Sequence, residues 1–374
     1  MILILLLVLF ALFVIVVSST TPSRVGLSHD MHDAPPLDIS SMGHKVIVES
    51  LYRNCARYGS CPTRLRTLTP RNGIHFDDIL VQQYREHDAA LIDDADYLLA
   101  QYSTPQVLLW KDVDKPVVVQ AAVRYECEIG EARWKVLNAE LIRRSKDGRS
   151  TIAANSKYDA AYINYFTGID VEWIPSWTGD YATARYAPTQ PEILFGDTRV
   201  DGLDQFLPDN VVRVREFYDD VTFERVASHP AYIQIPYAPS LMSVFEAYAM
   251  NVPLLVPSLD FYWELHRTLG VCREATWERT RSGKPASGSP LPRHPNATGP
   301  VSDPNDDSHP GFKDWLALSD WYQWENTIQF DSWDHLKELL NTTDFAEVSR
   351  RQAEENARRR RTIRNQWRNV LNRM

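Results

Sequence analysis

The sequence predicts an α/β fold with two parallel-sheet domains of similar size. Short, strongly apolar segments alternate with helical segments in both halves of the chain, which is the pattern of strands buried on both faces of a sheet. The 374 residues, 44% of them hydrophobic and 24% charged, suffice for two packed domains. The net charge of −9 argues against a general nucleic-acid-binding protein, because binding to a phosphate backbone requires a basic surface.

The N-terminus has the features of an export signal. Residues 2–17 are uninterrupted apolar residues followed by Ser and Thr, so residues 1–19 are interpreted as an uncleaved type II membrane anchor, with a cleaved signal peptide as the alternative. Residues 20–43 are polar and contain prolines, as in a stem between a membrane and a folded body. Two possible N-glycosylation sites, Asn296 and Asn341, agree with a body in the lumen of the endoplasmic reticulum or Golgi, or secreted after cleavage.

The four cysteines indicate no metal cluster. Cys55 and Cys61 are close enough for a small-loop disulfide, whereas Cys127 and Cys272 are far apart in the sequence and are left as free thiols. No Cys-x-x-Cys motif or nearby histidine pair occurs, so a zinc site is not expected.

The first domain is assigned to residues 44–175. Segments 93–100 and 115–120 each end a polar stretch with an apolar run, and residues 134–144 carry apolar residues at helical spacing. Another strand at 151–156 leads into a helix that Ser156 can cap and Gly168 ends. Segment 171–176 is a strand that leads to a domain boundary.

The second domain is assigned to residues 176–343 and repeats this alternation. We expect strands within 191–196, 231–236 and 252–257, and a helix within 241–250. Residues 280–311 are rich in Pro, Ser, Gly and Asp and predict a disordered insertion. The C-terminal segment 344–374 predicts a basic helix whose arginines 358–361 form a solvated face, with a juxtamembrane role as the alternative.

The order of these elements resembles the GT-B glycosyltransferases over roughly residues 90–340. Segments 151–156 and 171–176 resemble the end of that family's first domain, and 191–196 resembles the first strand and glycine turn of its donor domain. The most specific segment is 239–257, in which Ser and Glu open a helix before a Val-Pro strand. The resemblance implies two Rossmann-like domains facing a cleft, a nucleotide diphosphate sugar as co-substrate, and neither a cofactor nor a bound metal.

The donor-site candidates are Arg199, Ser240, Ser243 and Glu246. A loop followed by a helix start at a sheet edge presents free amides to a diphosphate, and Ser243 lies three residues before Glu246, on the same helix face. In the family, the corresponding glutamate binds ribose. Two departures leave the stereochemical outcome open: Ala238 stands where retaining members often carry glutamate, and Asp204 stands where a lysine is usual.

In the first domain, Arg124 and Glu126 follow a predicted strand and are the catalytic candidates. The carboxylate can accept a proton from an acceptor hydroxyl, and the arginine can stabilise developing charge; a salt-bridged surface pair is the alternative. The family's usual histidine is missing at this edge. Asp112-Val-Asp114 matches a metal motif of another glycosyltransferase fold, but it precedes a strand rather than following one and is interpreted as a turn.

These features together predict a glycosyltransferase that transfers a sugar to a hydroxyl of a glycan, glycoprotein or glycolipid in the secretory pathway. Its expected partners are the donor, the acceptor and a membrane, and not nucleic acid. A catalytically silent lumenal binding protein that keeps the fold is the alternative, motivated by the departures from the family pattern. An epimerase-like nucleotide enzyme is weakened because no Gly-x-Gly-x-x-Gly motif follows an early strand.

Overall fold

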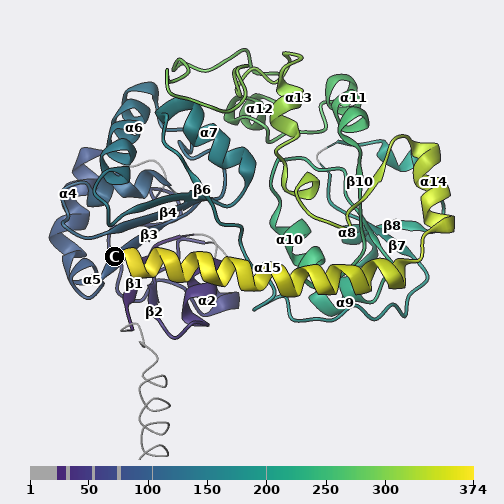
Figure 1. Ribbon diagram of the computed structural model, residues 1–374, viewed down its shortest axis with the longest axis horizontal. Helices are drawn as coiled ribbons and strands as arrows, with labels where there is room; N and C mark the ends of the chain where they lie inside the picture. Colours follow the sequence, from purple (N-terminus) through teal and green to yellow (C-terminus); the bar gives the residue numbers. More distant parts are fainter. Residues whose placement is uncertain (1–22, 31–33, 53–54, 74–76, 103, 199) are drawn as a thin grey trace, which may run out of the picture.

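The computed structural model describes residues 23–30, 34–52, 55–73, 77–102, 104–198 and 200–374. These residues form two α/β domains, each with one sheet whose strands all run parallel (Figure 1). The predicted fold class, two parallel-sheet α/β domains, is therefore confirmed. No helix in this part of the chain is both long and apolar enough to cross a membrane, and the predicted signal or anchor at residues 1–19 lies outside it.

The first domain contains a six-stranded sheet in the order β2-β1-β3-β4-β5-β6. Helices cover both faces of this sheet. In the strand β4, alternate side chains point to opposite faces, and both sets are buried. Val117 and Val119 pack against α6, whereas Val118 packs against α15. The elements are β1 (Val25–Ser28), α2 (Ala34–Ser40), β2 (Lys45–Val48), α3 (Cys55–Tyr58), α4 (Asp78–His87), α5 (Ala89–Asp93), β3 (Tyr97–Ala100), the 3₁₀ helix η1 (Thr104–Trp110), β4 (Val117–Ala121), α6 (Glu131–Ser145), β5 (Thr151–Ala154), α7 (Lys157–Thr167) and β6 (Glu172–Trp173).

The second domain contains a five-stranded sheet in the order β11-β10-β9-β7-β8. Its strands are only two to four residues long, and their buried side chains are almost all apolar. The elements are β7 (Ile193–Phe195), η2 (Leu203–Phe206), β8 (Val211–Arg213), α8 (Val214–Phe217), α9 (Phe223–Ala227), β9 (Tyr232–Ile233), α10 (Met242–Ala249), β10 (Leu254–Pro257), α11 (Leu259–Leu269), α12 (Trp277–Ser282), α13 (Phe312–Leu316), η3 (Asp320–Tyr322), β11 (Ile328–Phe330), α14 (Trp333–Thr342) and α15 (Phe345–Arg373).

The predicted stem at residues 20–43 requires a correction, because it contains β1 and α2. The strand β1 pairs with both β2 and β3 and therefore lies inside the first sheet. Its residue Gly26 leaves no room for a side chain, since a Cβ there would lie 2.4 Å from the Tyr97 ring. The first domain thus begins before residue 44, and the polar composition of the surrounding residues hid a four-residue strand.

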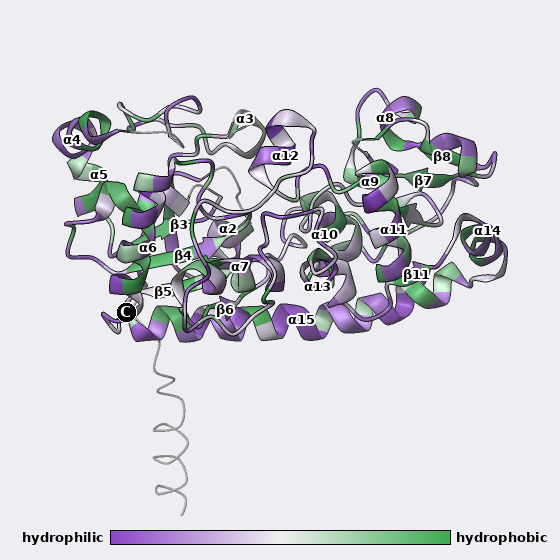
Figure 2. Ribbon diagram, turned by 90° about the horizontal axis from the view of Figure 1, so that it is seen from above, coloured by the Kyte–Doolittle hydropathy of each residue, from purple (hydrophilic) through white to green (hydrophobic). Residues whose placement is uncertain are grey.

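The C-terminal helix α15 joins the two domains (Figures 1 and 2). Its 29 residues span roughly 43 Å at about 1.5 Å per residue. The first half contacts α10, where Asn356 donates to the carbonyl of Tyr248 at 2.6 Å. The second half returns to the first sheet, where Ile363 and Trp367 are buried. The chain therefore crosses between the domains a second time.

The arginines 358–361 of α15 are not simply a solvated face. Arg359 stacks on Trp324 at 4.6 Å, and Arg360 pairs with Asp180 of the interdomain linker at 2.6 Å. Arg358 pairs with Glu325 at 2.7 Å, where both side chains are exposed. Part of the basic run therefore holds the second domain and the linker against the helix, which corrects the expectation of a purely solvated face.

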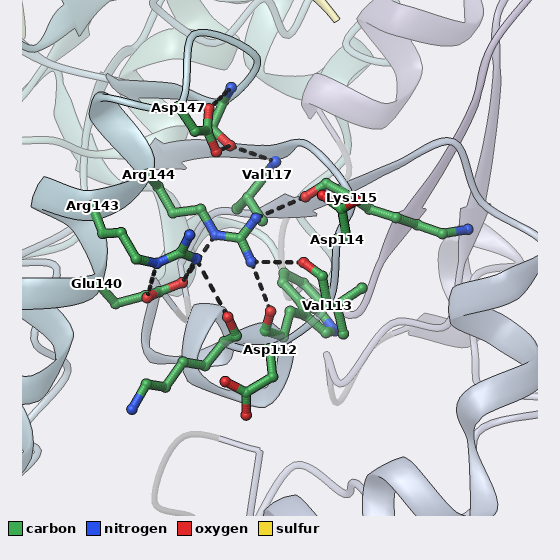
Figure 3. A network of polar contacts seen from close by, with 12 residues as sticks. Asp112, Val113, Asp114, Lys115, Val117, Glu140, Arg143, Arg144 and Asp147 are labelled. Atoms are coloured by element: carbon green, nitrogen blue, oxygen red, sulfur yellow. Dashed lines mark hydrogen bonds and ion pairs between the residues drawn. The ribbon is translucent and has the colours of Figure 1, made fainter.

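The Asp112–Asp114 segment is a turn before β4, as predicted (Figure 3). Its backbone is held by Arg144, whose buried guanidinium donates to the carbonyl of Val113 at 3.1 Å and to that of Lys115 at 2.8 Å. Asp112 and Asp114 are exposed and pair with Arg85 and Arg149. These carboxylates therefore serve as surface partners of arginines rather than as a paired site.

The predicted cysteine chemistry agrees with the structure. A disulfide joins Cys55 and Cys61 with the two Cα atoms 4.7 Å apart, and Cys127 and Cys272 are free and buried.

Residues 280–311 pack against the first domain, which corrects the predicted disordered insertion. Figure 1 shows this segment running from α12 over α7 before it returns to α13. Asn164 of α7 accepts a hydrogen bond from the Thr298 amide at 2.8 Å, and the His294 amide donates to the carbonyl of Tyr165 at 2.7 Å. Inside the segment, Asp307 forms a buried ion pair with Arg279. The segment has few apolar residues, and it is held in place by hydrogen bonds to other parts of the chain.

Substituting Asn164 with alanine should loosen this segment. The change leaves the Thr298 amide without its acceptor, and a lost hydrogen bond of this kind costs about 1–2 kcal/mol. Thermal unfolding should shift to lower temperature, and trypsin should cleave faster after the half-buried Arg293 of the insertion. The control is Asn210→Ala, because Asn210 is an exposed loop residue. Equal cleavage rates in the two variants would contradict a packed insertion.

Candidate active site between the domains

The loop that joins β4 to α6 carries both catalytic candidates, Arg124 and Glu126. These side chains are only 3% and 4% exposed, so they are not the surface pair that was the alternative interpretation. The loop is strained, since Cys127 and Glu128 adopt left-handed backbone angles with φ of 49° and 62°. Such conformations are uncommon for residues other than glycine and cluster at functional sites.

Glu126 is a buried carboxylate with one bonded oxygen. Its Oε1 accepts a hydrogen bond from the Tyr162 hydroxyl at 2.9 Å, and that hydroxyl accepts one from the Asn305 amide of the insertion at 2.7 Å. The other oxygen, Oε2, has no hydrogen-bond partner within the part of the chain that the structure describes. Burial raises the pKa of Glu126 to about 7, against the opposing effects of the hydrogen bond from Tyr162 and the charge of Arg124.

Arg124 supplies a fixed positive charge beside this carboxylate. Its guanidinium lies 5.4 Å from the centre of the Trp277 ring, and the Trp277 indole donates to the Arg124 carbonyl at 3.3 Å. Burial disfavours the charged form of Arg124 and alone would lower its pKa. The nearby carboxylates of Asp159 and Glu126 favour the charged form more strongly, so the pKa of Arg124 is raised. Burial also raises the pKa of Asp159 to about 6, partly offset by the charge of Arg124.

A cavity of about 270 Å³ opens at Glu126. Its walls come from both sides of the interdomain boundary: the loop and first turn of α6, the helix α12, and the insertion. The lining residues include Glu126, Glu128, Trp134, Trp277, Glu278 and Asn305. The cavity places a buried, titratable carboxylate against a space large enough for a small polar molecule.

The second group of candidates lies at the carboxyl edge of the second sheet. β7 ends at Phe195 and is followed by Gly196, where a Cβ would lie 2.1 Å from the Gln234 side-chain oxygen, so only glycine fits. On α10, Glu246 Oε1 accepts a hydrogen bond from Tyr181 at 3.1 Å. Burial, and then the charge of Glu246, raise the pKa of Tyr232 on the neighbouring β9. Glu246 therefore lies near Tyr232, whose hydroxyl is close to Gly196 just after β7.

The two serines have different positions. Ser240 lies where the domains meet, and its hydroxyl accepts a hydrogen bond from Asn155 of the first domain at 3.3 Å. Ser243 is exposed on the first turn of α10, a helix whose start carries no side-chain cap. In that turn the Val244 amide donates to the Leu241 carbonyl at 3.1 Å, so only the amides before it could bind an anion. Arg199 lies outside the described residues.

The structure brings Glu126, Arg124 and Ser240 to one interdomain region. Ser240 is hydrogen-bonded to Asn155, which lies at the end of β5. Asp159, on the helix that follows, interacts electrostatically with Arg124. A hollow of about 570 Å³ beside the cavity is lined by Arg273, Arg279 and Arg281, and Arg281 also lines the cavity. The hollow adjoins the loop that follows β9, because the Glu274 amide donates to the Tyr237 carbonyl at 2.7 Å.

Several residues of this region were not predicted from the sequence. Tyr162, Asn305 and Trp277 reach the site from α7, the insertion and α12, and no local motif marks them. His29 and Asp30 directly follow β1, and recognising that strand would have pointed to them. His29 bonds the Tyr84 hydroxyl at 2.8 Å through Nε2, and burial lowers its pKa to about 4, so this ring is neutral.

No group of three or more His, Cys, Asp or Glu side chains able to hold a metal ion occurs among the described residues.

No protein-family model matches the chain, and no curated protein matches it. Solved structures with a similar architecture include CalG4, the calicheamicin glycosyltransferase, at 12% identity and a TM-score of 0.43 over 95% of this chain and 100% of that one. SnogD from Streptomyces nogalater, a glycosyltransferase, is 12% identical with a TM-score of 0.41 over 93% and 100%. The glycosyltransferase VinC, solved with dTDP, is 11% identical with a TM-score of 0.42 over 94% and 100%. At these TM-scores the similarity adds nothing to what the sheet topology already shows.

Proposed function

We propose that this protein is a glycosyltransferase that transfers a sugar from a nucleotide diphosphate sugar to an acceptor hydroxyl. The observation that carries the proposal is Glu126, a buried carboxylate with a raised pKa that lines a cavity between two parallel-sheet domains. A general base needs a pKa near the working pH and access to the proton that it removes. The raised pKa of Glu126 meets the first requirement, and its position in the cavity wall supports the second.

The donor would bind along the carboxyl edge of the second sheet. Its ribose would lie at Glu246 and its diphosphate near the first turn of α10, with Ser240 and Ser243 as hydroxyl donors. Arginines such as Arg273 and Arg281 would neutralise the charge of the departing diphosphate. Arg199, which follows Gly196 in the sequence by three residues, is a further candidate for that role.

In the transfer step, the acceptor oxygen forms a bond to the anomeric carbon, and the bond from that carbon to the diphosphate oxygen breaks. The nucleoside diphosphate leaves with the electron pair, and Glu126 takes the proton of the acceptor hydroxyl. Arg124 would stabilise the negative charge that develops beside it.

We also propose that the reaction occurs in the lumen of the secretory pathway, on a glycan, glycoprotein or glycolipid. The apolar segment 2–17 supports export, and both glycosylation sequons present exposed asparagines, Asn296 and Asn341. Exposure is the condition for modification by a glycan.

The test is an activity screen of the purified full-length chain. Uridine, guanosine and thymidine diphosphate sugars would be combined with saccharide acceptors, and release of nucleoside diphosphate would be measured. We expect at least one pair to give release that depends on the acceptor. Donor binding without release from any pair would support the catalytically silent binding protein instead.

A further inference from the structure

We propose that the cavity at Glu126 is an acceptor site for an uncharged sugar ring, and that the insertion selects this acceptor by forming one wall. The inference rests on the proposed function, because it assigns the acceptor class for the same site. It concerns the insertion, residues 280–311, to which no role was assigned from the sequence.

The size and lining of the cavity suit one sugar ring. Its volume of about 270 Å³ lies just below the roughly 300–1,000 Å³ of small-molecule sites, which suits a single ring. Trp134 and Trp277 supply aromatic surface, and Glu126 and Asn305 supply polar groups in the wall. Aromatic walls with a few convergent polar groups are typical of such sites.

The charge of the lining indicates which sugars would be excluded. The cavity is lined by the carboxylates Glu126, Glu128, Glu131 and Glu278, against the single arginine Arg281. Glu131 is paired with Lys135 at 2.5 Å, and Glu278 lies 3.7 Å from Arg281. The surplus of carboxylates would repel an acidic ring such as a uronate or a sulfated sugar, because like charges at short range are unfavourable.

The insertion provides part of the wall of the cavity. Ala286, Gly288 and Pro290 line the cavity, and Asn305 lies within hydrogen-bonding distance of the Tyr162 hydroxyl that holds Glu126. The same segment is fixed to α7 through Asn164. The contacts that order the insertion therefore also shape the space available to the acceptor.

The experiment compares neutral and acidic glycosides that share a ring. Binding of methyl glucoside, galactoside and mannoside, and of the matching methyl uronates, would be measured on the full-length chain by saturation-transfer NMR without donor. We expect at least tenfold weaker binding of the uronates. The double variant Glu128→Gln/Glu278→Gln should reduce that difference at least threefold, whereas Glu338→Gln, on the exposed side of α14, should leave it unchanged.

Three results would overturn the inference: no glycoside binds, uronates bind as well as neutral glycosides, or the double variant behaves like Glu338→Gln. These results are separate from the proposed function. If neutral glycosides bind selectively but no donor gives transfer, the sugar site is supported and the transferase function is rejected. If neutral and acidic acceptors receive sugar equally, the transferase function is supported and the selective acceptor site is rejected.

Discussion

Replacing Glu126 with glutamine should lower turnover by about 10²–10⁴-fold, which is the usual contribution of a general base. Glutamine keeps the shape of the side chain and can still accept a hydrogen bond from Tyr162, but it cannot take the proton of the acceptor. Donor affinity should change less than twofold, because Glu126 lies on the first-domain side of the cavity. Initial rates and donor titrations of the two proteins would separate these effects.

The same carboxylate predicts the pH dependence. With a pKa of about 7 for Glu126, kcat/KM should rise with pH through this value, because the base must be ionised. The charged groups facing it are Arg124 and Asp159, with the Tyr162 hydroxyl as hydrogen-bond donor. A rate that is flat between pH 6 and 8 would contradict the assignment.

Thermal unfolding provides the control for folding in the Glu126→Gln variant. The native carboxyl keeps its proton up to a pKa of about 7, against 4.5 for the ordinary side chain, so its stabilising effect is present below pH 4.5 and is lost as the pH rises to 7. Glutamine resembles the protonated form. The variant should therefore be as stable as the natural protein at pH 4.5 and more stable at pH 8. Lower stability at both pH values would indicate a structural role instead.

Replacing Glu246 with glutamine should weaken donor binding by about tenfold to a hundredfold. A hydrogen bond to a charged group contributes roughly 1.5–3 kcal/mol, and glutamine removes the charge while keeping the shape. The hydrogen bond from Tyr181 can be made to the glutamine oxygen, so the melting temperature without ligand should hardly change. Calorimetric titration with the nucleotide sugar would measure the loss.

The matched control is Glu264→Gln, because Glu264 is exposed on α11 of the same domain. It should bind the donor like the natural protein. If Glu246→Gln also bound the donor normally, or if it unfolded the protein, the donor site would not lie on α10.

The order of strands and helices could be predicted from the sequence where burial was complete. β3, β4, β5, β7 and β10 all lie within the predicted apolar segments, because strands covered on both faces must be apolar throughout. The cap of α7 was also predictable, since Ser156 accepts from the Asp159 amide and Gly168 takes the left-handed angle that ends the helix.

The remaining elements depend on tertiary contacts that have no local signal. The strand β1 is only four residues long and contains Gly26, and the insertion is ordered by partners such as Asn164, more than 130 residues away in the sequence. Glu126 could be named from its place after a strand, but its partner Asn305 comes from the segment expected to be disordered. The composition of a segment shows which of its own side chains can form a core. It does not show which side chains of another domain can form hydrogen bonds with the segment.

The most direct test of the central claim is the stoichiometry of the transfer reaction in the screen described above. Nucleoside diphosphate and new glycoside would be quantified together, by chromatography and mass spectrometry, for the natural protein and for Glu126→Gln. We predict one nucleoside diphosphate released for each glycoside formed, with both products falling together in the variant. Release without a glycosidic product, or equal product from the variant, would contradict glycosyl transfer at this site.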